Sequence, residues 1–60
     1  MAKMIKVTCM GETKQWENRE QAIAYYSKKA VSSTGVIQAN NIIIINQLNS
    51  GRYICSDIIP

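Results

Sequence analysis

Four consecutive isoleucines at positions 42–45 stand in a chain of only 60 residues, and they constrain its fold more than any other feature. In a strand, successive side chains point to opposite faces, so the run would make both faces apolar. In a helix, the apolar residues of this region form two sides, one with Ile37, Ile44 and Leu48 and the other with Val36, Ala39, Ile42 and Ile43. A chain of this length buries only about 60% of its unfolded surface. We therefore expect it to lack the material to cover both sides.

An element that is apolar all round has to be buried. Symmetric self-association through one shared patch is the commonest solution. We therefore expect a homodimer, or a tight complex with another protein, centred on Ile42 and Ile43. The alternative is a monomer whose core takes up all of these side chains. The candidate interface residues combine this second apolar side with aromatic types that dominate interface hot spots: Ile42, Ile43, Val36, Tyr25, Tyr53 and Trp16.

The N-terminal part of the chain has the pattern of a β-hairpin. Residues 3–10 alternate well enough to predict a strand. The residues of this strand that share one face are Ile5, Val7 and Cys9. A tight turn at Gly11 and Glu12 and a return strand over 13–16 complete the hairpin.

Residues 19–31 are predicted to form an amphipathic helix. Asn18 is a favourable N-cap. Behind it, apolar residues recur at the spacing of one helical face, namely Ala22, Ile23, Tyr26 and Ala30. Glu20 in the first turn and Lys28 and Lys29 near the end suit the helix dipole. Because a two-stranded ribbon is marginal in water, this helix should cover one face of the hairpin.

The second half of the chain has two interpretations. Isoleucine is a strong strand former, and residues 49–51 look like a turn, which would give the order ββαββ with residues 42–58 as a second hairpin. The competing interpretation is a second helix over about 36–48, with Gly51 just past its end. Composition alone favours the strand.

Several short motifs follow one another in a fixed order: Cys9-Met10-Gly11, Asn18-Arg19-Glu20-Gln21-Ala22-Ile23, Tyr26, Ser33-Thr34-Gly35, Leu48, Gly51 and Cys55-Ser56-Asp57. This order resembles a family of very small, mostly uncharacterised accessory proteins of bacterial plasmids, prophages and conjugative elements. The second helix of that family is usually charged, and this chain departs from it with its isoleucine run. The resemblance implies a single α+β domain over residues 1–60, with the order ββααβ, and we adopt this order.

The resemblance also implies a function. We expect a non-enzymatic protein-binding module, dimeric because of its apolar surplus, and the resemblance indicates that it is of phage or mobile-element type and blocks a surface of a larger host or element-encoded protein. A bacterial host-defence system is the expected target. The chain shows no secretory leader, and its longest apolar run is far shorter than the roughly 20 residues that span a bilayer. We therefore expect a cytoplasmic protein with no membrane partner.

The sequence contains few residues that could support catalysis. There is no histidine to act as a general base near neutral pH. Two widely separated cysteines, Cys9 and Cys55, cannot complete a tetrahedral zinc site. We therefore expect no enzymatic activity, no catalytic residue, no metal and no cofactor. The two thiols would become neighbours if the last strand pairs beside the first.

The basic residues support an alternative function, a small nucleic-acid-binding accessory or regulatory protein. The net charge is +3. The candidate residues are Arg19, Lys28, Lys29 and Arg52. Only Lys28 and Lys29 are adjacent, and no basic stripe is visible. Protein binding is therefore the preferred hypothesis.

Overall fold

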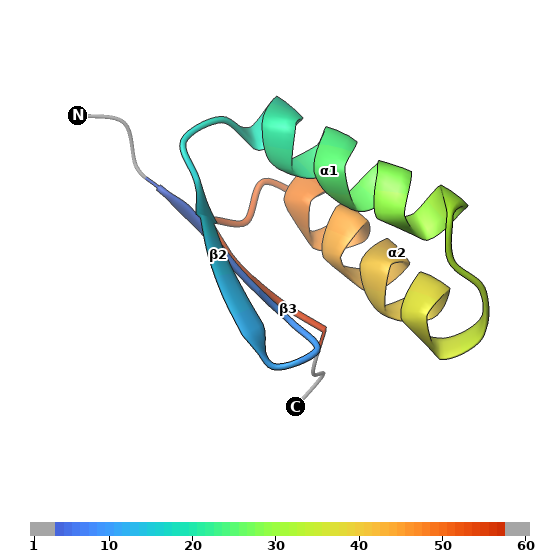
Figure 1. Ribbon diagram of the computed structural model, residues 1–60. Coiled ribbons are helices and arrows are strands. Elements are labelled where there is room, and N and C mark those ends of the chain that lie inside the picture. Colours follow the sequence, from blue (N-terminus) through green and yellow to red (C-terminus); the bar gives the residue numbers. More distant parts are fainter. Residues whose placement is uncertain (1–3, 58–60) are drawn as a thin grey trace.

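A computed structural model describes residues 4–57 and shows an α+β fold with the order ββααβ (Figure 1), which confirms the predicted fold class. The elements are β1 (Ile5–Cys9), β2 (Glu12–Trp16), α1 (Arg19–Val31), α2 (Gly35–Asn49) and β3 (Ile54–Ser56). In the three-stranded sheet, β1 lies in the centre, with β2 antiparallel and β3 parallel to it. Positions 3 and 58, which bound the predicted first strand and the alternative second hairpin, lie outside the described residues.

The turn between β1 and β2 consists of Met10 and Gly11, so the predicted turn at Gly11 and Glu12 is wrong by one residue. Both turn residues have positive φ angles, 52° and 79°, as a type I′ turn requires. Glu12 already pairs with Cys9 in the ladder. The Met10 N–H donates to Asp57 Oδ2 at 2.8 Å, which ties the turn to the segment after β3. The sequence pattern missed this because methionine rarely adopts a positive φ.

Helix α1 has the bounds that the sequence predicts. The Asn18 side chain accepts a hydrogen bond from the Glu20 N–H at 2.7 Å, which pairs one of the free donors at the start of the helix. The predicted apolar face is buried at Ala22, Tyr26 and Ala30. Both helices lie on the same face of the sheet (Figure 1), so the hairpin is covered as expected.

Residues 42–49 belong to α2, so the alternative second hairpin over 42–58 is wrong. The helix ends at Asn49. Gly51 lies just beyond it with a φ of 92°, as the helical interpretation predicts. Strand propensity loses here because it measures how well a side chain fits a pleated, half-buried surface rather than an intrinsic backbone preference. The helix buries Ile44 and Leu48 completely while lying along α1.

The core lies between the two helices and the inner face of the sheet. It contains Ile5, Val7, Cys9, Ala22, Tyr26, Ile44, Leu48 and Cys55. Among residues 4–57, no helix covers the outer face of the sheet (Figure 1). On that face Lys6 is exposed, and Ile54, which pairs with it across β1 and β3, is 74% exposed.

The side chain of Gln47 closes the outer edge of β3. Its Nε2 donates to the Ser56 carbonyl oxygen at 2.6 Å, and its Oε1 accepts from the Ser56 N–H at 3.0 Å. The amide therefore replaces a neighbouring strand at this position. Covering an edge in this way prevents it from pairing with another chain.

Candidate protein-binding surfaces

The side of α2 that points away from the core carries a group of apolar residues, with the exposed Asn46 among them. We call the apolar group the α2 face, and it consists of Val36, Ala39, Ile42 and Ile43. Val36 is 75% and Ile42 45% exposed, while Ala39 is exposed and Ile43 half-buried. None of the 15 residues of α2 is charged. The fold therefore buries Ile44 and Leu48 on one apolar side of this helix, leaves Ile37 of that side 47% exposed, and leaves most of the other side uncovered.

The spacing of the α2 face suits helix packing. Val36, Ala39 and Ile43 follow the i, i+3, i+7 pattern, which places them in one stripe along the helix. Ile42 lies beside this stripe. The small side chain of Ala39, between two larger ones, would let another helix approach closely.

The other candidate interface residues lie elsewhere. Trp16 and Tyr25 belong to an aromatic cluster between β2 and α1, and their ring centroids are 5.0 Å apart. Tyr26 is the third member, with its ring centroid 6.0 Å from that of Trp16 and 5.0 Å from that of Tyr25. Tyr53 is 42% exposed and lies against the guanidinium of Arg19, 5.1 Å from its ring centroid. The predicted set is thus divided among three places.

Two lysines converge on Tyr25 from different elements. Lys14 Nζ, on β2, lies 5.0 Å from the ring centroid, and Lys29 Nζ, on α1, lies 5.2 Å from it. Glu12 forms an ion pair with Lys14 at 3.2 Å. The Lys14 ammonium, and to a lesser extent that of Lys29, lowers the pKa of the Tyr25 hydroxyl. No sequence pattern indicates this cluster, because it depends on how α1 packs over the hairpin.

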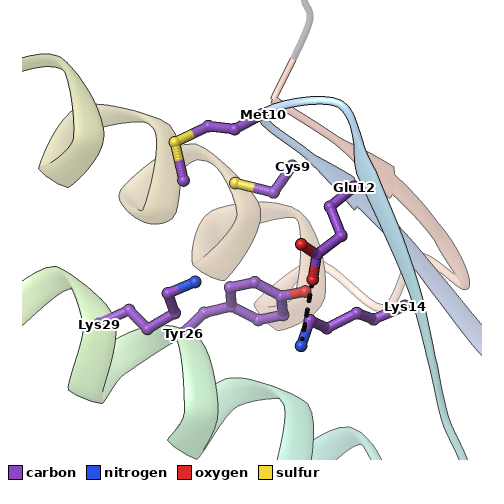
Figure 2. A pocket seen from close by; sticks show the side chains of 6 residues that line it. All are labelled: Cys9, Met10, Glu12, Lys14, Tyr26 and Lys29. Atoms are coloured by element: carbon purple, nitrogen blue, oxygen red, sulfur yellow. Dashed lines mark ion pairs between the residues drawn. The ribbon is translucent and has the colours of Figure 1, made fainter.

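A small cavity of about 70 Å³ opens between the hairpin end and α1 (Figure 2). Its lining residues are Cys9, Met10, Glu12, Lys14, Tyr26 and Lys29. The Glu12–Lys14 ion pair lies on one side of it, and Lys29 approaches from α1 (Figure 2). The cavity is large enough to admit water.

Cys9 and Cys55 are buried, free thiols on the same face of adjacent strands. Cys55 pairs with Val7, and Cys9 lies two residues further along β1. Standard strand spacings therefore separate the two Cα atoms by about 8 Å, beyond the roughly 7 Å limit for a disulfide. Burial raises the pKa of both thiols, and the Asp57 carboxylate adds to this effect at Cys9.

Both cysteines should be slow to alkylate in the folded protein. The thiolate is the reactive form, and folding hides both groups and raises their pKa values. Iodoacetamide should therefore modify the native protein far more slowly than the chain in denaturant. By the same linkage, the free energy of unfolding should fall as the pH rises through the range in which the unfolded chain's thiols ionise. Equal labelling rates in both states would contradict this arrangement.

The basic residues of the alternative hypothesis do not form one surface. Arg19, the first residue of α1, donates hydrogen bonds to the carbonyl oxygens of Leu48 (2.7 Å), Arg52 (2.9 Å) and Gly51 (3.2 Å). Lys28 and Lys29 lie in the last turn of the same helix. The guanidinium of Arg19 is therefore occupied within the protein, at the opposite end of α1 from the two lysines.

Comparison of the chain with protein-family models, with curated proteins and with solved structures gives no match. Within residues 4–57, neither helix has the length and hydropathy needed to cross a membrane. Over the same residues, no three Cys, Asp or Glu side chains come together as a metal site would require.

Proposed function

We propose that this protein is a non-enzymatic protein-binding module that forms a homodimer through the α2 face. The carrying observation is the contrast between the two sides of α2. Ile44 and Leu48 are fully buried, whereas Val36 on the other side is 75% exposed. Leaving so much isoleucine and valine surface in water costs free energy that a partner would recover.

A second copy of the chain suits the α2 face. In a two-fold contact the same patch meets itself. Because α2 has no charged residue, such a contact brings no like charges of the helix together. A two-fold axis across the stripe also sets the two helices antiparallel, so that the positive end of each dipole lies near the negative end of the other.

A contact of usual proportions on so small a chain would give a weak and reversible dimer. A specific interface takes roughly a tenth of the surface of a small protein. One tenth of the 4231 Å² surface of this chain is about 420 Å² for each subunit. Interfaces with less than about 1,200 Å² in total are typical of transient complexes. We therefore expect association that depends on concentration in the micromolar range.

The resemblance to accessory proteins of mobile elements supports a narrower proposal. The dimer would act by covering a surface of a larger host or element-encoded protein, and a host-defence protein is the candidate target. This part rests on the resemblance alone, whereas the dimer rests on the α2 face.

Sedimentation equilibrium over a micromolar concentration range tests the dimer. Val36→Glu and Ile42→Glu should each weaken association by at least about tenfold, because a carboxylate would be buried without a partner. Val36 lies in the first turn of α2, where an acidic side chain suits the dipole, so this variant should remain folded.

Ile54→Glu is the matched control. Ile54 is as exposed as Val36 but lies on the outer face of the sheet, and it pairs with Lys6. This variant should dimerise like the wild type. A wild type that stays monomeric throughout, or an equal loss in all three variants, would remove the proposal.

A further inference from the structure

Strand β2 forms an open edge of the sheet. In a two-residue hairpin the residues flanking the turn, here Cys9 and Glu12, exchange hydrogen bonds, and the pairs then alternate. The backbone N–H and C=O groups of Thr13 and Gln15 must therefore point away from β1. Among residues 4–57, no hydrogen bond reaches these backbone groups. An edge of this kind is a template for another strand.

The lysine of this edge strand does not protect the edge. A lysine on an edge strand normally deters another strand from pairing. The side chain of Lys14 is instead drawn back over the inner face of the sheet by Glu12, at 3.2 Å, and lies 5.0 Å from the Tyr25 ring centroid. The other edge of the sheet is different, because Gln47 occupies the outward groups of Ser56.

Positive charge gathers beside this edge. Lys14 and Lys29 flank Tyr25, and Lys28 adjoins them on α1. Two carboxylates lie near the hairpin end. Asp57 is engaged by the Met10 N–H, and Glu12 neutralises Lys14 alone. Between Glu20 and Asp57 the chain has no acidic side chain at all. An incoming segment would therefore meet an excess of ammonium groups on the side of the sheet that faces α1.

We infer that β2 and α1 bind an extended acidic segment of a partner protein by strand addition. The backbone of the segment pairs with Thr13 and Gln15, and its carboxylates lie towards Lys14 and Lys29. Main-chain hydrogen bonds supply affinity in this mode, and alternate side chains supply specificity. The site shares no residue with the α2 face, so it does not depend on the proposed dimer.

Glu12 has a defined role in this arrangement. It holds Lys14 in an internal ion pair, and an acidic ligand must compete with it for the same ammonium. Glu12→Gln should therefore tighten binding, although the variant removes a polar contact from the protein. Glu17→Gln is the control, because it makes the same change of charge at an exposed residue just after β2. If the peptide were attracted by net charge alone, the two variants would strengthen binding equally.

A capped peptide of alternating Thr and Glu is the probe, with a Thr and Lys version as its control. Backbone amide signals of the full chain, followed by NMR during titration, should shift in a saturable way at Thr13 and Gln15 with the acidic peptide only. Thr13→Pro should weaken binding by at least about tenfold, because it removes an outward N–H without touching the ladder to β1. Circular dichroism shows whether that variant is folded.

Lys28 and Lys29 offer a second test of the site, with a matched pair of variants that does not place a proline in a strand. Lys29→Gln should weaken peptide binding by roughly threefold, as expected for an exposed ion pair, while Lys28→Gln should change it less. The inference would be overturned if the basic peptide bound as tightly as the acidic one. It would also be overturned if neither Thr13→Pro nor Lys29→Gln weakened binding of the acidic peptide. Val36→Glu should bind the peptide like the wild type, so failure at the edge and failure of the dimer are separate results.

Discussion

Leu48→Ala should leave most of the protein unfolded at room temperature. Leu48 is fully buried between α2, α1 and the sheet. Truncation of a buried leucine to alanine typically costs about 2–5 kcal/mol, as lost transfer free energy and as an unfilled cavity. A core of this size rarely supplies more than roughly 3–5 kcal/mol of stability. The expected loss is therefore comparable to the whole free energy of unfolding.

Urea denaturation followed by circular dichroism measures this effect. Val36→Ala is the control, since it removes side-chain atoms from the same helix at a position that is 75% exposed. It should change the free energy of unfolding by less than about 0.5 kcal/mol, as surface substitutions usually do. A cost below about 1 kcal/mol for Leu48→Ala would contradict the packing of α2 against the sheet. Both variants should be compared at a protein concentration below the range of dimerisation, because dimerisation would add stability by mass action and Val36 belongs to the α2 face.

The elements whose signals are local could be predicted from the sequence. Residues 19–31 carry an N-cap, a regular apolar face and complementary charges at both ends, and α1 has those bounds. The alternation in β1 likewise predicts which of its residues are buried. For α2 the local signals conflict, since isoleucine favours a strand. The order of motifs along the chain favoured the helix there, and burial of Ile44 and Leu48 explains why the helix prevails.

The exposed apolar surface could be predicted from the sequence only where all of its residues lie on a single helix. A helical wheel places Ile42 opposite Ile44 and puts Val36 beside Ile43 and Ala39 at the other margin of the outer side, and the structure leaves both Val36 and Ile42 exposed. The cluster of Lys14 and Lys29 at Tyr25 could not be found this way, because its members come from β2 and α1. The same is true of Gln47 at β3, which looks like an ordinary polar flank on the wheel.

The position of Arg19 in the sequence indicates a partner outside its own helix. An arginine at the first position of a helix opposes that helix's own dipole, which is a reason to look for a partner elsewhere. Its guanidinium lies at the C-terminal end of α2 and donates to three carbonyl oxygens, at 2.7, 2.9 and 3.2 Å. Free carbonyls at a helix end need such donors, and a cation suits the negative end of the dipole. One side chain thus joins the start of α1 to the end of α2.

Arg19→Met should lower the free energy of unfolding by about 2–3 kcal/mol, since hydrogen bonds from a charged donor contribute roughly 1.5–3 kcal/mol and these are partly exposed. Methionine keeps the aliphatic bulk, so the loss reports the guanidinium. Arg19→Lys should restore less than half of it, because one ammonium cannot fork between several carbonyls. Arg52→Met, at an exposed position on the same loop, should cost less than about 0.5 kcal/mol. Hydrogen exchange supplies a local readout: amides of residues 50–53, just after α2, should lose protection in Arg19→Met before those of α2 do. Full rescue by lysine, or unchanged exchange in that segment, would show that the three contacts do not hold the end of α2.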